Sequence, residues 1–234
     1  MKGVLIVIVL TMFANGSQLL QPQTDSANQP LTLSSTKPDM AYIIRRVHSA
    51  LGPTHRAVRL YFHGFCDVND GNAVQFPHIN VLPPEGNEEG IPAVLEMFRN
   101  DKSVMVSTDS SKIVRITIGN VYKPVLDTRL SSIKLTNVAQ YNPNLAIDAL
   151  ESAAPVQAAR RLYRMHQESQ MVIEAIAPPL RGEPHLPASM RNLTVDQALD
   201  SIAERFHGAV VYGECENGDK SHTVGIRYAW FRSH

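Results

Sequence analysis

The chain has 234 residues, of which 44% are hydrophobic and 19% are charged, so it has enough apolar side chains to form a folded core. Its 22 basic and 22 acidic residues balance, which excludes a broadly basic nucleic-acid-binding protein, because such proteins depend on neutralising phosphates. Its two cysteines are too few for a disulfide-rich scaffold or a four-cysteine zinc site.

Residues 1–16 have the pattern of a signal peptide. Lys2 supplies a positive charge, Val4–Phe13 is an uncharged apolar run, and residues 14–16 (Ala-Asn-Gly) suit a cleavage site. The apolar run is too short for a bilayer span, which needs about 20 residues. An uncleaved anchor or a buried helix is the alternative. Residues 17–38 are polar, and we interpret them as a flexible tether. We therefore expect an exported protein of the bacterial periplasm, with no transmembrane span in the mature chain.

Residues 39–122 are predicted to form a first α+β unit. Apolar residues recur at helical spacing from Met40 to Leu51, and Asp39 can cap this helix. Apolar side chains then alternate with others along Ala57–Phe65, which predicts a strand.

The rest of this first unit is predicted to run strand, helix, strand, strand. The predicted strand is Phe76–Leu82, and the predicted helix follows from Ile91 to Phe98. A hairpin is predicted to join Val104–Val106 to Ile113–Ile118.

Residues 123–168 are predicted to be a helical connecting segment. Asn142 and Pro143 form a favourable cap and first turn, and Pro155 is predicted to begin another helix. The helical spacing places three basic residues mostly on its outer face: Arg160, Arg161 and Arg164. We interpret these residues as a solvated helix face, and the alternative is a contact for an acidic partner.

Residues 169–234 are predicted to form a second α+β unit. Met171–Ile176 has the composition of a strand. Thr194 and Gln197 have the spacing of a capping box, and the helix that they begin is predicted to end at Gly208 in a left-handed conformation.

Two further strands complete the second unit, Ala209–Tyr212 and Val224–Phe231, which are joined by a turn. The order strand, helix, strand, strand is therefore predicted twice. The predicted fold class is α+β, with two small βαββ-type units joined by a helical segment and preceded by a signal peptide and an α-β element.

The second unit resembles a known small domain. Leu193–Ala203 (LTVDQALDSIA), followed by the strand Ala209–Tyr212 (AVVY), is similar to the short N-terminal domain of secretins and TonB-dependent receptors. Glu88–Ile118 matches the same pattern more loosely. The resemblance covers less than half of the chain, and it implies a domain for protein–protein contacts in the envelope, without catalytic residues.

The sequence offers few residues for catalysis or metal binding. Ser34–Lys37 fits the S-x-x-K pattern of penicillin-interacting enzymes, but it lies in the polar tether and no S-D-N or K-T-G follows.

A zinc site would need the side chains of three residues to converge on one metal ion: His63, Cys66 and Cys215. We favour scattered surface histidines over such a site. Asp67–Asp70 contains calcium-ligand residue types at the wrong spacing, so we interpret it as a turn. We assign no catalytic, cofactor-binding or metal-binding residue.

The two cysteines, Cys66 and Cys215, each follow an apolar strand and precede a polar turn. An oxidising compartment favours their pairing, provided that their Cα atoms lie within about 7 Å of each other. The alternative is two buried thiols that never meet. The spacing alone does not decide between these alternatives.

The features above favour a non-catalytic protein-interaction module of the bacterial envelope. A strand edge such as Val224–Phe231 is expected to accept a strand of a partner envelope protein. The alternatives are a small periplasmic enzyme of the hydrolase type and a ligand-binding or metal-binding protein. We expect no cofactor, and no nucleic acid among the partners.

Overall fold

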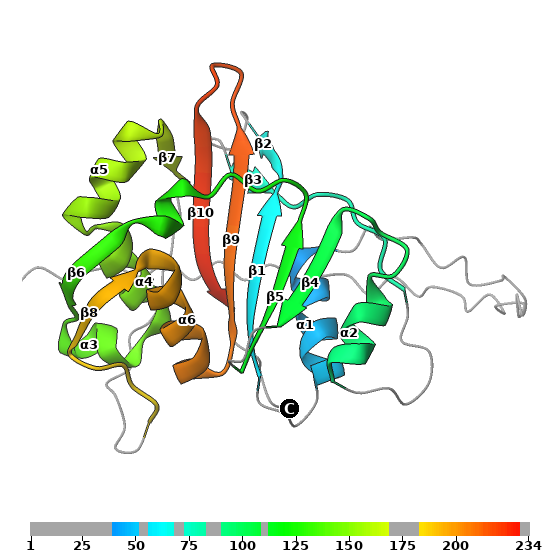
Figure 1. Ribbon diagram of the computed structural model, residues 1–234, viewed down its shortest axis with the longest axis horizontal. Helices are drawn as coiled ribbons and strands as arrows, with labels where there is room; N and C mark the ends of the chain where they lie inside the picture. Colours follow the sequence, from blue (N-terminus) through cyan, green and yellow to red (C-terminus); the bar gives the residue numbers. More distant parts are fainter. Residues whose placement is uncertain are drawn as a thin grey trace, which may run out of the picture. The chain divides into compact units, whose positions relative to one another are not determined.

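A six-stranded mixed sheet runs through the centre of the computed structural model (Figure 1). From edge to edge its strands are β4 (Val104–Thr108), β5 (Ile113–Ile118), β1 (Ala57–His63), β9 (Ala209–Glu216), β10 (His222–Ala229) and β7 (Met165–Gln167). β5, β1 and β9 are parallel, whereas β4 and β10 are antiparallel to their inner neighbours. Two small antiparallel sheets lie outside it: β2 (Phe65–Asp67) with β3 (Ala73–Gln75), and β6 (Arg129–Lys134) with β8 (Ser189–Thr194). This mixture of helices and sheets confirms the predicted α+β class.

The structure describes residues 39–51, 56–67, 73–82, 90–108, 112–168 and 183–229. These residues all belong to one compact unit. The predicted signal peptide (1–16), the tether (17–38) with its S-x-x-K motif, and the predicted strand Met171–Ile176 lie outside the described residues. None of the helices within the described ranges is long and apolar enough to cross a membrane.

Helices cover both faces of the central sheet. One face packs against α1 (Met40–Leu51) and α2 (Ile91–Met97). The other face packs against α4 (Pro143–Glu151) and α6 (Val195–Phe206), beside the shorter η3 (Pro124–Asp127), α3 (Asn137–Tyr141) and α5 (Ala154–Leu162). Because strand side chains alternate between faces, β1 sends Leu60 and Phe62 into the first core and Tyr61 into the second.

Local sequence signals set the beginnings of α4 and α6 as predicted. The apolar stripe of α1 is buried, and the Asn142 side chain caps α4 by accepting from the backbone N–H groups of Asn144 and Leu145. The predicted capping box of α6 is present, since Thr194 and Gln197 each accept a hydrogen bond from the other's backbone N–H. These signals act between residues close in sequence, which is why the pattern alone was sufficient to locate them.

The prediction of two separate βαββ units is wrong. Residues 76–82 form no strand, and the strand predicted to open the second unit, Met171–Ile176, lies outside the described residues. β1 lies between β5 and β9, so the segments 39–122 and 169–234 contribute to one sheet. The connecting segment 123–168 adds β7 to this sheet and β6 to the small sheet with β8. The reason is that an apolar period identifies a strand but not its neighbour, and β1 is buried from Ala57 to Phe62.

The end of α6 differs from the prediction in one residue. His207 adopts the left-handed conformation, with a φ angle of 52°, and Gly208 does not. Gly208 is needed for another reason, because a Cβ atom there would lie 2.0 Å from the hydroxyl of Tyr228. That hydroxyl donates a hydrogen bond to the carbonyl oxygen of Phe206, 2.9 Å away, and so ties the helix end to β10.

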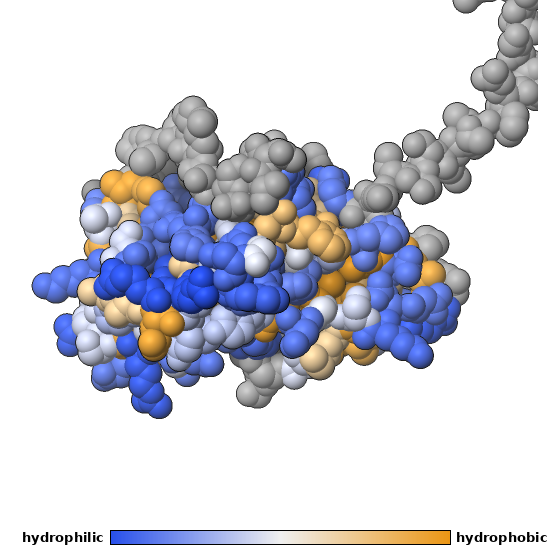
Figure 2. Space-filling model, turned by 90° about the horizontal axis from the view of Figure 1, so that it is seen from above, coloured by the Kyte–Doolittle hydropathy of each residue, from blue (hydrophilic) through white to orange (hydrophobic). Residues whose placement is uncertain are grey.

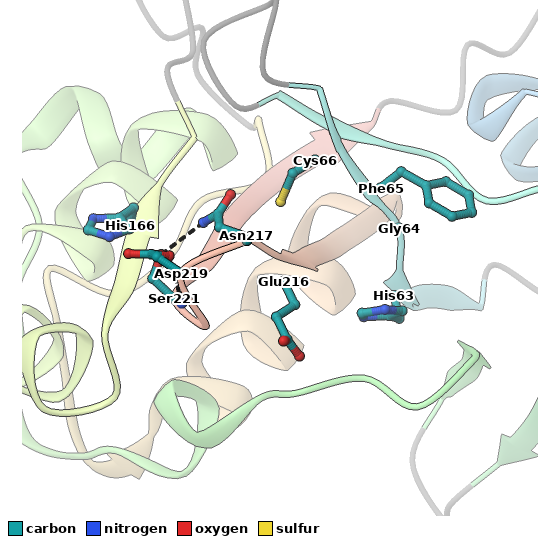
Figure 3. Close-up of a pocket in the computed structure, with 10 residues that line it drawn as sticks. His63, Gly64, Phe65, Cys66, His166, Glu216, Asn217, Asp219 and Ser221 are labelled. Carbon is teal, nitrogen blue, oxygen red and sulfur yellow. Dashed lines mark hydrogen bonds between the residues drawn. The ribbon is translucent and has the colours of Figure 1, made fainter.

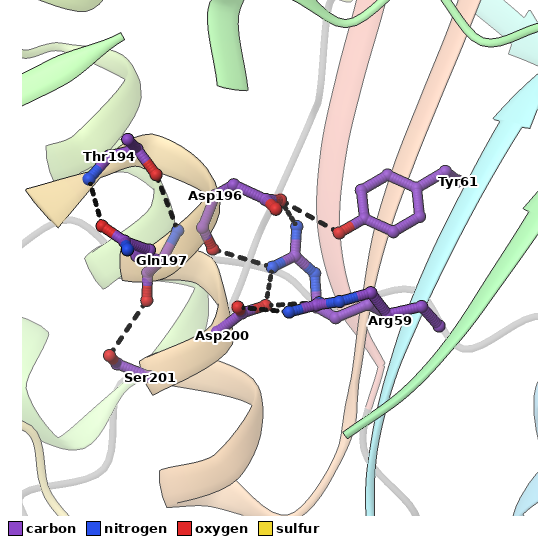
Figure 4. Close-up of polar contacts among 8 residues, drawn as sticks. Arg59, Tyr61, Thr194, Asp196, Gln197, Asp200 and Ser201 are labelled. Carbon is purple, nitrogen blue, oxygen red and sulfur yellow. Dashed lines mark hydrogen bonds and ion pairs between the residues drawn. The ribbon is translucent and has the colours of Figure 1, made fainter. Parts of the chain in front are cut away.

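A buried ion network attaches α6 to the sheet (Figure 4). Arg59 of β1 is fully buried and contacts the carboxylates of Asp196 and Asp200, both on α6. Arg115 of β5 contacts Asp200 at 2.7 Å, and the Tyr61 hydroxyl donates to Asp196 at 2.9 Å. Burial raises the pKa of Tyr61 above its usual range. The helical pattern alone places Asp200 on the polar face of α6, and the network shows that this face also meets the sheet.

The apolar face of α6 is expected to contribute strongly to stability. Leu199 and Ile202 have no exposed surface. Truncation of either residue to alanine is therefore expected to lower the free energy of unfolding by about 2–5 kcal/mol, from lost burial and the cavity left behind. Denaturant melts measure this effect, with the exposed Glu204→Ala as a control on the same helix. Equal midpoints for all three variants would contradict it.

Arg160 is buried, which corrects the prediction that it lies outside. Its Nη2 donates to Oε1 of Glu151, and Gln167 Nε2 donates to the other carboxylate oxygen at 3.1 Å. Arg161 and Arg164 are exposed, as predicted. Helical spacing could not distinguish these arginines, because the partner of Arg160 lies on the preceding helix.

Glu151 is expected to make stability depend on pH. Burial raises its pKa from 4.5 to about 7, despite the attraction of Arg160, so the folded protein holds this proton more tightly than the unfolded chain. The resulting stabilisation is complete below about pH 4.5 and is lost as the pH rises to about 7. The free energy of unfolding of the wild type, relative to Glu151→Gln, is expected to fall by up to about 3 kcal/mol across this range. Urea melts at several pH values test this, and parallel pH profiles would contradict it.

Candidate functional site

The candidate site lies at the carboxyl ends of the parallel strands β1 and β9. After β1 the chain continues to β4 and β5 on one side, and after β9 it turns into β10 on the other side, so the connections leave these two adjacent strand ends in opposite directions. In open sheets with parallel strands, such a point leaves a crevice beyond the strand ends, where ligands commonly bind. The segment between β5 and η3 passes across these strand ends (Figure 1).

A cavity of about 660 Å³ opens at this position (Figure 3). Its walls are residues 63–66 after β1, residues 216–219 and Ser221 around the β9–β10 turn, and His166 of β7. His63 and His166 lie on opposite sides of the cavity, with Glu216 between them in the view of Figure 3. This volume is in the usual range for a small-molecule site.

Glu214 of β9 is the centre of a buried polar cluster beside this cavity. Its carboxylate has no exposed surface, and it accepts three hydrogen bonds. His63 Nδ1 and the backbone N–H of Tyr122 donate to Oε1 over 2.6 and 3.0 Å, and His222 Nδ1 donates to Oε2 over 3.0 Å. A buried carboxylate needs such partners, because leaving it unpaired costs several kcal/mol.

The carboxylate fixes the orientation of both imidazoles. Since Nδ1 of His63 and of His222 faces Glu214, Nε2 is the nitrogen that each ring can offer to another group. His222 also stacks on the ring of Tyr122, with centroids 4.2 Å apart. The Tyr212 hydroxyl donates to the carbonyl oxygen of Tyr122 at 3.1 Å, which holds the crossing segment in place. The His63 side chain is 43% exposed, so its outer nitrogen is accessible.

The β9–β10 turn supplies the acidic wall of the cavity. Asp219 accepts from the backbone N–H and the hydroxyl of Ser221, which lowers the pKa of the Asp219 carboxyl. Lys220 lies 2.6 Å from the carboxylate of Glu216 and lowers its pKa in the same way. Arg164 pairs with Asp219 at 3.3 Å. Both cavity carboxylates are therefore ionised at neutral pH.

Cys66 and Cys215 form a disulfide, with Cα atoms 5.4 Å apart. The bond joins β2, in the cavity wall, to β9. It removes both thiolates from the metal site considered for His63, Cys66 and Cys215. Within the described ranges, no group of three or more His, Cys, Asp or Glu side chains is placed to hold a metal ion. Asp67 belongs to β2, and residues 68–70 of the calcium-like turn lie outside the described residues.

The edge of β10 is partly covered, and residues 230–231 of the segment expected to accept a strand, Val224–Phe231, lie outside the described residues. At one end, β7 pairs with β10, and the backbone N–H of Glu168 donates to the carbonyl oxygen of Val224 at 2.8 Å. At the other end, the Asn144 side chain accepts from the backbone N–H of Tyr228 at 3.3 Å. Sequence analysis could not foresee this cover, because β7 has only three residues and lies far from β10 in sequence.

His63 was considered as a ligand from the sequence, whereas Glu214 and Tyr122 were missed as parts of one site. One signal was available for Glu214. It follows Val210 and Tyr212 on the same face of an apolar strand, where a carboxylate is expected only with a partner. No local signal marks Tyr122, since the crossing of its segment over β9 is a property of the topology.

Comparisons with protein families, curated proteins and solved structures find no match to this chain. The resemblance to the short N-terminal domain of secretins and TonB-dependent receptors therefore stays a prediction, carried by Leu193–Ala203 and Ala209–Tyr212.

Proposed function

We propose that the protein is an exported, non-catalytic interaction module of a bacterial envelope and that it binds a segment of a partner protein in this cavity. The observation that carries the proposal is the pair of imidazoles fixed by buried Glu214 beside an accessible cavity. Fixed polar groups of this kind give a site specificity, because they lose little entropy when a partner binds.

Two exposed aromatic side chains near the cavity suit contact with a protein partner, and the ring of Phe65 is directed away from the other lining residues (Figure 3). Phe65 of the wall is 68% exposed, an unusual position for a phenylalanine. Tyr122, which stacks on His222 beside the cavity, is 38% exposed. Seen from above, the surface is mainly hydrophilic with apolar patches between the polar areas (Figure 2). Exposed aromatic side chains next to fixed polar groups are typical of protein–protein contact sites.

Site-specific cross-linking tests this proposal. A photoreactive amino acid placed at Phe65 is expected to form one discrete adduct with an envelope protein in intact cells. The matched control is the same amino acid at Leu162 of α5, which is 73% exposed and outside the cavity. An adduct at Phe65 that is absent at Leu162 supports the proposal. Equal adducts at both positions, or none at either, would exclude the cavity as the binding site.

Export is a part of the proposal that can be measured separately. The mature N-terminus is expected at Ser17 or within a few residues of it, in the periplasmic fraction, because the apolar segment Val4–Phe13 has the length of a signal peptide. N-terminal sequencing gives the answer, and an intact Met1 on cytoplasmic protein would contradict it.

We assign strand addition to β4 instead of β10. No described strand lies beyond β4, and its residues VMVST carry no charge that would oppose another strand. The carbonyl oxygen of Ser103 accepts a hydrogen bond from the backbone N–H of Gly119 over 2.8 Å. In this register the backbone groups of the odd-numbered residues of β4 are directed toward β5, so the backbone groups of Val106 point outward.

A photoreactive residue at Met105, which is 64% exposed, is expected to capture the partner. Val106→Pro removes an outward donor and is expected to abolish the adduct. An adduct that survives this change would exclude strand addition at β4.

The contact between His63 and Glu214 favours a second candidate function, a small hydrolase. An imidazole whose Nδ1 is held by a carboxylate can accept a proton from water at Nε2 and so act as a general base. Assays of the purified protein with ester and amide substrates test this candidate. Hydrolysis that is lost in His63→Gln supports it, and hydrolysis unchanged by that substitution would remove it.

A further inference from the structure

We infer that the protein has a second binding site, a pocket of about 280 Å³ between α1, β3 and the β9–β10 pair, which takes a small, mainly apolar molecule with an O–H or N–H donor. The donor is bound by Oε2 of the buried Glu168. This pocket shares no described lining residue with the cavity beside Glu214. The inference therefore goes beyond the proposed function, which concerns a protein partner in that cavity.

The pocket lies on the face of the central sheet that packs against α1 and α2. Figure 1 shows both helices toward the β4 edge of this face, whereas β3 packs against β9 and β10. Most of the lining is apolar, and it comes from α1, β1, β3, β9 and the segment after β3: Met40, Ala41, Phe62, Val74, Phe76 and Val211. The rings of Phe62 and Phe76 meet edge to face, with centroids 5.0 Å apart. The volume is near the lower end of the range for small-molecule sites.

Two glycines form the floor of the pocket. Gly213 of β9 and Gly225 of β10 lie opposite each other in the sheet, and both line the pocket. A Cβ atom at Gly213 would lie 2.3 Å from the ring of Phe62, and one at Gly225 would lie 2.0 Å from Oε2 of Glu168. A glycine inside a strand is typical of places where another group comes close to the backbone. Here the missing side chains let Oε2 lie directly on the floor of the pocket.

Glu168 is the buried polar group of this pocket. Its side chain is 2% exposed, and its Oε1 accepts from the backbone N–H of Val74 at 3.0 Å and pairs with Nη2 of Arg227. No residue in the described ranges donates a hydrogen bond to the other oxygen, Oε2. A buried carboxylate oxygen without a donor costs free energy, so a molecule that donates an O–H or N–H to it is favoured.

The bound molecule needs no charge of its own. Arg227 already balances the charge of Glu168, and Asp39 at the pocket caps α1 by accepting from the backbone N–H of Tyr42 at 2.6 Å. A further charge would lose its hydration without an opposite charge to pair with beside Oε2. The apolar body of the molecule gains from burial against the apolar lining. A phenol or a primary alcohol has both of the required parts.

A matched pair of probes, para-ethylphenol and para-ethyltoluene, tests the inference on the processed protein purified from producing cells. The two have nearly the same size, and only the phenol carries a donor. NMR titration is expected to show at least about tenfold tighter binding of the phenol, as for one hydrogen bond to a charged group.

Glu168→Gln is expected to abolish this preference. The amide oxygen takes the place of Oε1, which accepts from Val74 and faces Arg227, so the amide N–H₂ takes the place of Oε2 and offers a donor. Glu204→Gln on α6, outside the pocket, is the matched control and is expected to have no effect.

A second variant blocks the pocket without a change at Glu168. Ala41 is exposed and lines the pocket, so Ala41→Trp is expected to fill it. Binding of para-ethylphenol is expected to weaken at least about tenfold, with the denaturation midpoint nearly unchanged. The matched control is Ser49→Trp, because Ser49 is exposed on the same helix and outside the pocket.

The outcomes separate this inference from the proposed function. Equal binding of the two probes, or binding of the phenol that Ala41→Trp does not change, would overturn the inference. No binding of the phenol would show that water or another part of the chain satisfies Oε2, and would also overturn it. Cross-linking at Phe65 tests the proposed function alone, because Phe65 lines the cavity and not this pocket.

Discussion

Loss of the Cys66–Cys215 disulfide is expected to lower the free energy of unfolding by about 5 kcal/mol. The bond joins residues 149 positions apart, so it prevents the unfolded chain from occupying most of its extended conformations. A loss of this size is a large fraction of the stability of an average domain. The double substitution Cys66→Ala with Cys215→Ala, compared with the oxidised wild type in denaturant melts, measures the effect.

The reductant provides the control for this experiment. Dithiothreitol is expected to destabilise the wild type by reducing the disulfide, and to leave the double variant unchanged, because the variant has no disulfide to reduce. Thiol counting on denatured protein that was never reduced is expected to find no free thiol. Two free thiols in that measurement, or equal stability of wild type and double variant, would contradict the prediction.

Asp200→Ala is expected to lower the free energy of unfolding by about 3–5 kcal/mol, the cost of removing one partner from a buried ion network. Asp200 contacts the guanidinium groups of both Arg59 and Arg115. Arg59 has no exposed surface, so it would keep only Asp196 as a carboxylate partner. The hydrogen bond to Asp200 raises the pKa of Arg115, which agrees with a strong charge-assisted contact.

Glu204→Ala is the matched control for this variant, because Glu204 is an exposed acidic residue on the same helix. It is expected to change the free energy of unfolding by less than about 0.5 kcal/mol. Equal denaturation midpoints for the two variants would show that the network does not stabilise the attachment of α6. That result would agree with the helical pattern, which alone places Asp200 on the polar face of α6.

The disulfide and the ion network hold the two sides of the candidate site in register. The disulfide joins the β2 wall to β9, which carries Glu214, and the network attaches α6 to β1, which carries His63. Both strands that carry the contact between His63 and Glu214 are therefore tied to neighbouring elements. Preorganisation of this kind lowers the entropic cost of binding.

The local features of the protein could be predicted from the order of its amino acids. The apolar stripes of α1 and α6, the cap at Asn142 and the capping box at Thr194 were all predicted and are present. These features depend on residues within about four positions of each other, so a short stretch of sequence contains the whole physical cause. The α+β class follows from the same local periods of apolar residues.

The tertiary structure alone decided which segments lie together. Apolar alternation identified β1 and β9 but not their pairing, since a strand bonds to any neighbour with the right exposed backbone groups. That pairing places His63 against Glu214, although 151 residues separate them, and it brings Cys66 to Cys215. The burial of Arg59 likewise depends on α6 returning to cover β1. Contacts between distant segments are set by the packing of the whole chain, which is why the candidate site became visible only in the folded protein.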